Sequence, residues 1–437
     1  MTKYIFISGN ILEFRKSIFV GSIGALIKED SFKINIKKIT ENKLERTFVT
    51  SDGYELDTDM GFYERIAEIN TTLNNNLILN KNHKESDLVK FIKFDAKKYD
   101  IVLIESNNIY FYIIKYFINK YSKKNVIHIH FTSDSYLITN DNKPDLIINK
   151  NDFINFMNLN IYKIPYLLFD LKIKNKIYNL LDLKYNNYTK WVKIYYDLNN
   201  LNGIIYVYVI IKFNDSYISL MESLKHACYS LNKNIKIIWI DPENITKTEL
   251  FYKLNEYKGG IIVPGGFGNI GFENKINAIT FARENNIPFL GICYGMQIMV
   301  IEYARNKLNI NNATTEEIDI QNKYIHVINS IELINKNKKR LGNYVGKIDK
   351  KSIAYNIFNR EIYIERYRHN YKINNNYVND FEKNGLFFSG RSLDSQIMEI
   401  AEVPINKFFI GVQFHPELNS KIYNPNPIIL SFIKSFN

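Results

Sequence analysis

Residues 289–299 read FLGICYGMQIM, a short apolar run that ends at a cysteine with a glycine two positions to either side. The run PFLGI predicts a strand and the following YGMQIMVIEYA predicts a helix, so Cys293 lies at a sharp strand-to-helix turn. Gly291 and Gly295 allow strand and helix to approach closely there. The helix N-terminus supplies partial positive charge and free N–H groups, which favour a thiolate over a thiol. This stretch therefore predicts an α/β sheet with a nucleophilic cysteine at its edge.

The alternative for Cys293 is a small buried hydrophobic residue, which is what most isolated cysteines are. For Cys228, which lies in LKHACYSL in the interior of a predicted helix, we expect this alternative to hold. The chain has only these two cysteines. They are too few for a disulfide framework, and they lack the Cys/His spacing of a zinc site.

Strands and helices alternate on both sides of this turn. In the second half, strand-like runs begin at IIYVYVII and continue to FFIGVQF, with helical runs between them and PIILSFIKSF as a last helix. The later strands are closely spaced, which indicates an antiparallel extension of the sheet. The first half alternates in the same way from KYIFIS to PDLIIN and predicts a mostly parallel sheet. We expect two α/β domains, at residues 1–185 and 203–437, joined by a linker at 186–202.

Composition and charge limit the possible surroundings of the protein. No apolar run reaches the ~18–20 residues that a membrane span needs, and the N-terminus lacks the features of a signal peptide. The formal charge is +12, but lysines and arginines are scattered rather than clustered. Abundant Lys, Asn, Ile, Tyr and Phe, the residues of A/T-rich codons, explain that charge as a solvated surface. We expect a cytoplasmic protein with no nucleic-acid or membrane partner.

Two further motifs support a catalytic Cys293. GVQFHPE at 411–417 places His415 just after an apolar strand and Glu417 two residues later. A base that takes the thiol proton needs a fixed tautomer, which a carboxylate on its other nitrogen provides. VPGGFGNIG at 263–271 ends a strand in a glycine-rich loop whose backbone N–H groups are able to face an oxyanion. Tight turns use the same glycines, so this loop alone is weak evidence.

Together these motifs resemble the class I glutamine amidotransferases, whose domain has a flavodoxin-like sheet. PGGFG, GICYGMQ, RYRHNY and FHPE look like the glutaminase domain of the CTP synthase family, and the likeness extends over residues 203–437. It implies Cys293 as the nucleophile, His415 as its base and Glu417 as the residue that orients the base. It also implies a set of glutamine-binding residues: Gly266, Phe267, Tyr294, Gln297, Glu316 and Arg368. Of these, Gly266 and Tyr294 would provide the backbone N–H groups that bind the oxyanion.

Two positions differ from that family. Ile270 stands where the family has an arginine in the glycine-rich loop, and Asn370 replaces an arginine that helps to hold the bound glutamine. Arginine binds a carboxylate through two parallel charge-assisted bonds, which asparagine cannot reproduce. Glutamine affinity or its regulation is therefore expected to differ from that of the family.

KYIFISGN at 3–10 looks like the start of the family's amidoligase domain, a P-loop-like fold. The family's phosphate loop ends Gly-Lys-Gly, whereas this chain has NILEFRKSI, so Lys16 and Ser17 are the implied ATP contacts without the glycines that wrap phosphates. The alternative interpretation is that Lys16 is a solvated surface residue that binds no ligand. TSDGYELDTDMGFYER at 50–65 resembles the family's acidic stretch and implies Asp59 and Glu105 as Mg²⁺ ligands, unless they are ordinary loop acids. Several nucleotide-contacting loops of the family are shortened or missing.

The resemblance implies a reduced glutamine-hydrolysing enzyme that aminates UTP to CTP with ATP and Mg²⁺. Glutamine, UTP and ATP are then its substrates, GTP is a possible effector, and a homotetramer is the expected assembly. Two alternatives stay open. The chain either retains only glutaminase activity, because its phosphate loops are eroded, or is a non-catalytic remnant that pairs with another chain, because two arginines are lost.

Overall fold

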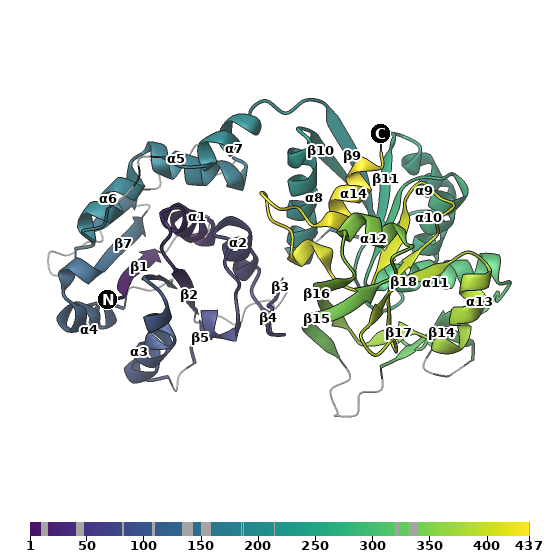
Figure 1. Cartoon of the computed structure of the whole chain (residues 1–437), viewed down its shortest axis with the longest axis horizontal. Helices are drawn as coiled ribbons and strands as arrows, with labels where there is room; N and C mark the ends of the chain where they lie inside the picture. Colours follow the sequence, from purple (N-terminus) through teal and green to yellow (C-terminus); the bar gives the residue numbers. More distant parts are fainter. Residues whose placement is uncertain are drawn as a thin grey trace. The chain divides into compact units, whose positions relative to one another are not determined.

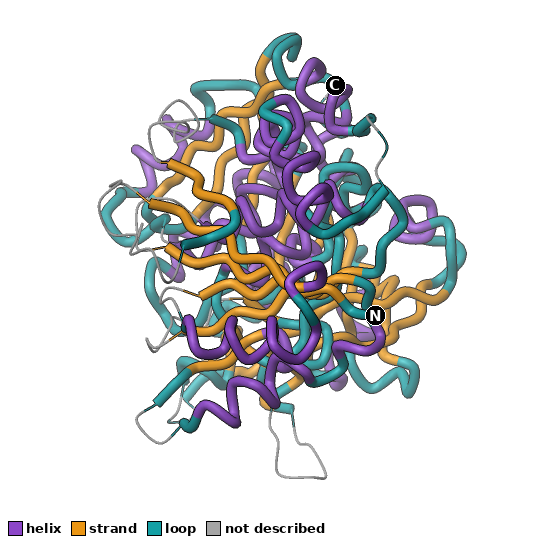
Figure 2. Tube along the Cα trace, turned by 90° about the vertical axis from the view of Figure 1, so that its left-hand side faces the viewer, coloured by secondary structure: helices purple, strands orange, loops and turns teal. Residues whose placement is uncertain are grey.

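The chain folds into two compact units. The structure, a computed structural model, describes the chain except residues 10–15, 41–47, 81–82, 107–109, 133–142, 150–158, 185, 187, 214, 320, 322, 332–338 and 437, and the side chains of 149 and 215. The first unit comprises residues 1–50 and 54–200, and the second comprises 51–53 and 201–437. In both units strands lie between helices (Figure 1; Figure 2).

The first unit is built on a six-stranded parallel sheet with the order β5-β2-β6-β1-β7-β8. Its apolar runs form buried strands because both faces are covered by helices. The strands are β1 (Lys3–Gly9), β2 (Ile34–Thr40), β5 (Asn76–Ile78), β6 (Ile101–Ser106), β7 (Val126–Thr132) and β8 (Leu146–Asn149). A separate two-stranded ribbon pairs β3 (Phe48–Val49) with β4 (Glu55–Leu56).

Helices cover the two faces of this sheet. They are α1 (Lys16–Lys28), α2 (Asp59–Ile66), α3 (Glu85–Lys93), α4 (Phe111–Tyr121), α5 (Ile164–Asp170), α6 (Ile173–Leu180) and α7 (Trp191–Asp197). Helices α3 and α4 share a core with Tyr4 and Phe6 of β1, and α1 packs on β2 and β6. Helix α7 lies within the segment predicted as a linker, and its Trp191 is fully buried in the first unit.

A nine-stranded mixed sheet forms the second unit, in the order β10-β9-β11-β12-β20-β19-β18-β15-β16. The strands from β10 to β20 pair in parallel, and those from β20 to β16 pair antiparallel. Its strands are β9 (Ile204–Ile210), β10 (Asn234–Ile240), β11 (Gly259–Val263), β12 (Phe289–Ile292), β15 (Arg340–Ile348), β16 (Ile362–His369), β18 (Phe387–Ser392), β19 (Met398–Glu402) and β20 (Phe409–Val412). A smaller sheet contains β13 (Ala313–Thr315), β14 (Ile325–Ser330) and β17 (Tyr371–Ile373).

Two hydrophobic cores lie on opposite faces of the large sheet, because successive strand residues point to opposite sides. Along β9, Val207 and Val209 enter one core and Tyr208 enters the other. Helices α8 (Ile218–Ser230), α12 (Ile353–Phe358) and α14 (Pro427–Lys434) cover the first face. The second face carries α9 (Lys247–Leu254), α10 (Phe272–Glu284), α11 (Tyr294–Lys307) and α13 (Val378–Lys383) (Figure 1).

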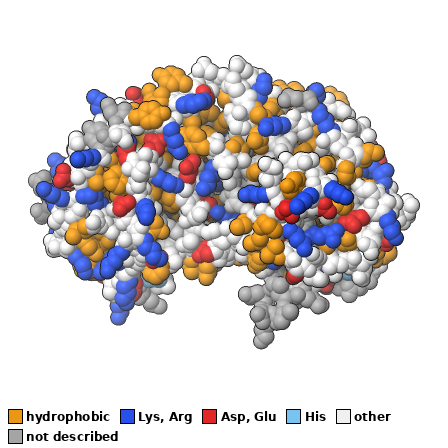
Figure 3. Space-filling view, in the orientation of Figure 1, with side chains coloured by type: hydrophobic (Ala, Val, Ile, Leu, Met, Phe, Trp, Pro, Cys, Tyr) orange, Lys and Arg blue, Asp and Glu red, His pale blue; other side chains and the backbone are white. Residues whose placement is uncertain are grey.

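The predicted fold class of two α/β domains with an antiparallel extension in the second is confirmed by these sheets. Of the phosphate loop predicted at NILEFRKSI, residues 10–15 lie outside the described residues, and the last three residues begin α1. None of the helices in the described part of the chain has the length and apolar character to cross a membrane. On the face drawn in Figure 3, Lys and Arg side chains are interspersed with other types.

Candidate active site

Cys293 lies between β12 and α11, where the backbone makes a strained turn. Its φ of 52° and ψ of −103° are unfavourable for a residue with a Cβ atom, and such strain is found mainly at functional sites. The Cys293 N–H donates to Val412 O at 2.7 Å, which ties the turn to the neighbouring strand β20. The side chain is buried and sits at the N-terminus of α11. The sulfur is thus held where free helix N–H groups favour a negative charge.

Gly291 and Gly295 are required by close backbone contacts around this turn. A Cβ atom at Gly295 would lie 1.8 Å from Val263 O, and one at Gly291 would lie 2.7 Å from Gly295 O. Neither position therefore accepts a side chain without a backbone shift. The predicted close approach of strand and helix is confirmed by these distances.

His415 follows β20, the parallel neighbour of β12, so the carboxyl ends of the two strands bring His415 and Cys293 to the same edge of the sheet. Pro416 begins a 3₁₀ turn, Pro416–Leu418, that returns Glu417 to the imidazole. His415 Nδ1–H donates to Glu417 Oε1 at 2.7 Å, which fixes the tautomer. The other ring nitrogen, Nε2, is buried and has no hydrogen-bond partner in the structure.

Charge around His415 favours its protonated form. Burial lowers the pKa of this imidazole, but the charge of Glu417 and the interaction with Cys293 raise it to about 10. At neutral pH the His415 ring is therefore an imidazolium beside the Glu417 carboxylate. Such a ring both stabilises a thiolate and carries a proton for a leaving group.

The glycine loop, residues 264–271, lies against this pair. A Cβ atom at Gly265 would lie 2.8 Å from His415 Cε1 and 3.6 Å from Cys293 Cβ, so only glycine fits there. Gly266, predicted as an oxyanion donor, is next along the loop and has Tyr294 as its neighbour. The Cys293 thiol itself donates to Arg368 O at 3.5 Å. Four distant segments of the sequence thus meet at one edge of the sheet.

The predicted glutamine-binding residues are only partly gathered. The Arg368 guanidinium lies over the Phe267 ring at 5.6 Å, and Phe267 is 47% exposed. By contrast, Gln297 Nε2 is buried and donates to Gln413 Oε1 at 3.1 Å and to Tyr371 O at 3.2 Å. Glu316 Oε2 accepts from Ser330 N at 2.6 Å. These two side chains are engaged within the protein, whereas the Arg368–Phe267 pair borders the solvent.

The two positions that were predicted to differ from the family both lie near this region. Ile270 in the glycine loop is 56% exposed. The Asn370 side-chain oxygen is buried without a hydrogen-bond partner in the structure. An unpaired buried carbonyl oxygen is energetically unfavourable, so the side chain at position 370 has an unsatisfied hydrogen-bond acceptor in the folded protein.

Three residues near the site were not predicted from the sequence. Tyr217 OH donates to Gly265 O at 3.1 Å, and burial and the nearby Glu417 charge raise the pKa of its phenol. His369 is fully buried, and burial together with Arg340 lowers its pKa to about 3. Glu317 Oε1 accepts from Gly268 N at 2.7 Å. His369 lies within the RYRHNY motif but was not singled out there, whereas Tyr217 and Glu317 act through contacts with a distant segment, the glycine loop.

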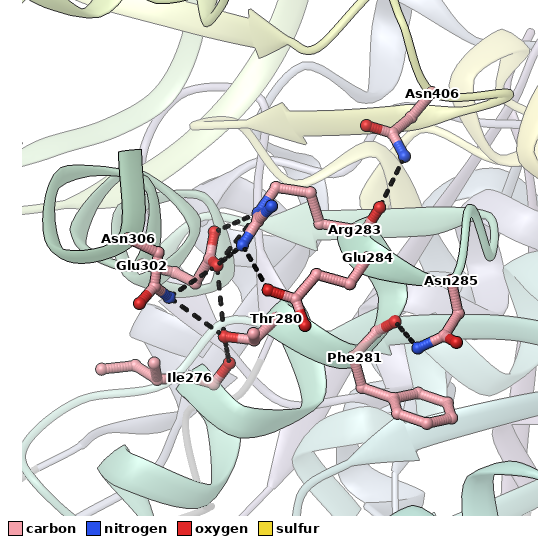
Figure 4. A network of polar contacts seen from close by, with 9 residues as sticks. All are labelled: Ile276, Thr280, Phe281, Arg283, Glu284, Asn285, Glu302, Asn306 and Asn406. Carbon is pink, nitrogen blue, oxygen red and sulfur yellow. Dashed lines mark hydrogen bonds and ion pairs between the residues drawn. The ribbon is translucent and has the colours of Figure 1, made fainter. Parts of the chain in front are cut away.

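A buried polar network joins α10, which follows the glycine loop, to α11, which follows Cys293 (Figure 4). Glu302 is fully buried and accepts from Arg283 NH2 at 2.8 Å and from Thr280 Oγ1 at 3.1 Å. Asn306 Nδ2 donates to the same carboxylate at 2.9 Å. Removing one partner of such a buried pair costs about 3–5 kcal/mol. The network therefore holds α10 and α11 together.

In the first unit, the predicted nucleotide-site residues come together at the carboxyl edge of the parallel sheet. Lys16, at the start of α1, donates from Nζ to Ser106 O at 2.7 Å. Ser17 Oγ donates to Glu105 Oε1 at 3.2 Å, and Tyr63 OH donates to Glu105 Oε2. Burial lowers the pKa of Lys16, and the charge of Glu105 opposes that shift.

Lys38 was not predicted, although it lies at the centre of this cluster. It is opposite Glu105 in the β2–β6 register, and its ammonium is bonded to Asp59 and lies 3.7 Å from Asp57 Oδ1. Burial lowers the pKa of Lys38, but Asp59, Glu105 and Asp57 together raise it. The sequence does not distinguish Lys38, because it is part of an apolar strand pattern, KINIKKI.

The cluster fits Mg²⁺ in its donor chemistry. Asp59 and Glu105 both act on Lys38 and on the Tyr63 phenol, so two hard carboxylates face one small region. Mg²⁺ typically takes one or two protein carboxylates and completes its shell with phosphates and water. In the described residues, no three His, Cys, Asp or Glu side chains are grouped as a complete protein-only metal site. Asp59 and Glu105 thus match the number of protein carboxylates that Mg²⁺ usually takes.

The fold and the geometry of the second unit define a class of protein, the class I glutamine amidotransferases: a cysteine at a strand-to-helix turn, a histidine held by a glutamate, and a glycine loop. The family model "Glutamine amidotransferase class-I" matches residues 212–435. The model "CTP synthase N-terminus" matches residues 3–85. The chain belongs to the CTP synthase family, a family of glutamine-hydrolysing ligases, as the resemblance predicted.

Full-length relatives support this assignment. The CTP synthase of Pelagibacter ubique is 32% identical, with 100% of this chain and 99% of the relative covered. The CTP synthase of Staphylococcus carnosus is 30% identical, with 100% and 98% covered. A solved glutaminase domain of Trypanosoma brucei CTPS, with bound acivicin, is 32% identical and has a TM-score of 0.50, with 53% of this chain and 93% of that one covered. The first alignment spans 538 positions and this chain has 437 residues, so the relative has segments that this chain lacks.

Proposed function

We propose that this chain aminates UTP to CTP, using ATP and ammonia released from glutamine. The observation that carries this proposal is the meeting of Cys293, His415 and Glu417 beside the glycine loop. Family membership supplies the reaction, and the first unit has a cluster of cations and carboxylates suited to nucleotide phosphates.

Glutamine hydrolysis is proposed to proceed through a thioester. The Cys293 thiolate attacks the side-chain carbonyl carbon of glutamine, and the oxygen becomes an oxyanion. The His415 imidazolium then gives its proton to the leaving nitrogen, and ammonia departs. Water next attacks the thioester with His415 as base, which releases glutamate and restores the thiolate. Glu417 keeps Nδ1 protonated throughout, so that Nε2 carries each proton.

We propose Gly266 and Tyr294 N–H groups as the oxyanion donors, because they belong to the loop and the helix start nearest Cys293. Arg368 and Phe267 are proposed to hold the amino-acid end of glutamine at the solvent border. Gln297 and Glu316 complete the set in this proposal, which requires them to exchange their present backbone and side-chain partners for substrate.

In the first unit we propose that ATP phosphorylates UTP, and that ammonia then displaces the phosphate. Lys16, Ser17 and Lys38 would meet phosphate oxygens at the start of α1 and the end of β2. Asp59 and Glu105 would hold Mg²⁺, which would supply positive charge to neutralise the phosphate oxygens. Internal ammonia transfer, a homotetramer, GTP as an effector and a cytoplasmic location are carried over from the family as part of the same proposal.

One assay tests the proposal: purified chain with glutamine, ATP, Mg²⁺ and UTP, with glutamate and CTP measured together. We expect both products. In Cys293→Ala we expect glutamate and glutamine-dependent CTP to be lost while added ammonia still supports CTP formation. Neither product from the wild-type chain would leave the non-catalytic remnant as the remaining interpretation.

The second candidate is an enzyme that only hydrolyses glutamine. It is favoured by one observation, the shortness of this chain relative to the 538 aligned positions, together with the altered sequence NILEFRKSI after β1. Glutamate without CTP, with either glutamine or ammonia as nitrogen source, would establish this candidate.

A further inference from the structure

The glycine loop is tied to its surroundings by side chains from several elements. Tyr217 OH donates to Gly265 O, and Lys275 Nζ donates to Ile270 O at 2.9 Å. At the centre of the loop, both the N–H and the carbonyl group of Gly268 form hydrogen bonds with side chains. Such ties are unusual for an exposed glycine-rich segment, which otherwise samples many conformations.

Gly268 is held by Tyr294 and Glu317. The Tyr294 OH donates to Gly268 O, and Gly268 N–H donates to Glu317 Oε1 at 2.7 Å. Gly268 has a φ of 72°, a value that glycine adopts readily. A Cβ atom there would meet nothing within 4 Å, so packing does not hold this residue. The two hydrogen bonds therefore define its position.

Tyr294 contributes to both proposed oxyanion donors. Its backbone N–H is one of them, and its side chain contacts the loop that carries the other, Gly266. Its own N–H is the first of α11, next to Cys293, and its phenol reaches the loop two residues beyond Gly266. The ring is 1% exposed, so it acts as a fixed spacer between the helix start and the loop. Oxyanion donors are effective only when they are held in place before charge develops.

Lys275 and Glu317 surround this phenol with opposite charges. The Lys275 ammonium lies 5.4 Å from the centre of the Tyr294 ring. Burial lowers the pKa of Lys275 to about 8, and the charge of Glu317 opposes the shift. Burial raises the pKa of Glu317, which its bond from Gly268 and the Lys275 charge partly offset. The charges of Lys275 and Glu317 lie near the phenol, but the position of Gly268 is set by its hydrogen bonds with Tyr294 and Glu317.

We propose that Tyr294 and Glu317 are positioning residues that clamp Gly268 and thereby hold the amide donor of the glycine loop at a fixed distance from Cys293. This inference rests on the proposed glutaminase chemistry and adds side chains that act through the loop, not on the substrate directly. It predicts a defect in the oxyanion-forming steps alone.

The test uses the full-length chain as Tyr294→Phe, with two readouts. The first is glutamine hydrolysis, for which we expect kcat to fall about 10- to 100-fold with little change in KM, because misplaced donors weaken only the transition state. The second is the rate of Cys293 alkylation by iodoacetamide, a displacement at a saturated carbon that forms no oxyanion. We expect this rate to stay within about twofold of wild type.

Tyr303→Phe is the matched control. Tyr303 is on the same helix α11, is 3% exposed, and donates its OH to another backbone carbonyl, Asn384 O at 2.6 Å. Its loss removes an equivalent bond away from the loop, so kcat should match wild type. Equal kcat in Tyr294→Phe and wild type overturns the clamp, and so does an equal loss of hydrolysis and alkylation.

Glu317 provides an independent arm. Glu317→Gln keeps an oxygen that accepts from Gly268 N–H, so we expect near wild-type kcat, whereas Glu317→Ala should lower it as Tyr294→Phe does. Equal damage in the two variants overturns a hydrogen-bonded clamp. A wild-type chain that releases no glutamate overturns the proposed function and the clamp with it, whereas an active wild type with insensitive variants overturns the clamp alone.

Discussion

His415 Nδ1 lies 2.7 Å from Glu417 Oε1, two residues further along the chain. A single proline-initiated 3₁₀ turn, Pro416–Leu418, makes this contact local, so the carboxylate orients the imidazole without help from a distant element. The contact leaves Nε2 without a hydrogen-bond partner in the structure, beside a cysteine that arrives from the neighbouring strand. A local turn thus orients the His415 ring, and the pairing of β12 with β20 brings Cys293 to it.

Selective alkylation should distinguish the two cysteines. Cys228 is fully buried, and burial raises the pKa of its thiol to about 12, so almost no thiolate forms near neutral pH. At pH 7.5 we expect iodoacetamide to label one site per chain, with labelling lost in Cys293→Ala and kept in Cys228→Ala. Mass spectrometry of the labelled peptide checks this. Label on Cys228 in the folded wild type would contradict it.

Glu417→Gln should lower both activity and stability, and the stability effect depends on pH. The folded pKa of His415, about 10, exceeds its unfolded value of about 6.5. Stability from the protonated ring is therefore complete below about pH 6.5 and lost as pH rises to about 10. We expect the difference in thermal midpoint between wild type and Glu417→Gln to be largest at pH 6 and to shrink towards pH 10. A difference that grows with pH would contradict the assignment.

The same variant should hydrolyse glutamine about 10²- to 10⁴-fold more slowly, as expected when a base loses its orienting acid. Gln has the same size and still accepts a bond from Nδ1, so the fold should be kept. Steady-state glutamate release at pH 7.5 is the measurement, and the wild-type near-ultraviolet circular dichroism spectrum serves as the folding control. An unchanged kcat would remove Glu417 from the proposed triad.

Cys293→Gly should unfold at a higher temperature than Cys293→Ala. The turn holds residue 293 at a φ of 52°, where a residue with a Cβ atom is strained by about 1–3 kcal/mol and glycine is not. Greater chain entropy of glycine offsets part of this gain. We expect a rise of a few degrees by calorimetry, since about 1 kcal/mol shifts the midpoint of a 150–250-residue domain by about 2–4 °C. A lower midpoint for the glycine variant would indicate no strain at this turn.

Lys16→Met should abolish CTP formation and leave glutamine hydrolysis intact. Lys16 is buried among the cluster at the carboxyl edge of the first sheet, and the glutaminase residues belong to the other unit. We expect at least about a 10²-fold loss of ammonia-dependent CTP formation, the typical effect of losing one group that stabilises charge in a transition state. Lys28→Met, at the exposed end of the same helix α1, is the control and should match wild type. Full activity in Lys16→Met would exclude it from the ATP site.

Asn370→Arg should improve glutamine binding. The Asn370 side-chain oxygen has no hydrogen-bond partner in the structure, and an arginine there would offer charge-assisted bonds to a carboxylate. We expect KM for glutamine to fall about 10-fold with kcat unchanged, as measured by initial rates. Asn376→Arg adds the same charge at an exposed position and should leave KM as in wild type. An equal effect of both variants would point to general electrostatic attraction.

Apolar patterns predicted most of the fold, and their failures have physical reasons. Buried parallel strands such as β12 give continuous apolar runs, which are easily recognised. Strand β15 was not predicted, because RLGNYVGKI has two glycines and exposes Tyr344 and Val345 to solvent. Helix α7 lies in the segment predicted as a linker, although its Trp191 is fully buried and the helix belongs to the first unit.

The site was predicted where neighbours in sequence also act together. Glu417 and His415 share one turn, and Cys293 stands between its two glycines, so both are visible as motifs. Glu317 and Lys38 were missed because their partners lie in other segments. Their roles come from contacts, and residue type alone does not distinguish them from surface charges.

The sequence by itself determined the α/β class and the family and predicted the nucleophile and its base, because short-range patterns and local turns encode these features. Tertiary structure alone decided which residues meet: the pairing of β12 with β20 brings Cys293 to His415, and the packing of α11 brings the Tyr294 phenol to Gly268. The physical reason is that hydrogen bonds and charges act over a few ångströms of space. Residues far apart in the chain reach that range only after the sheet has formed.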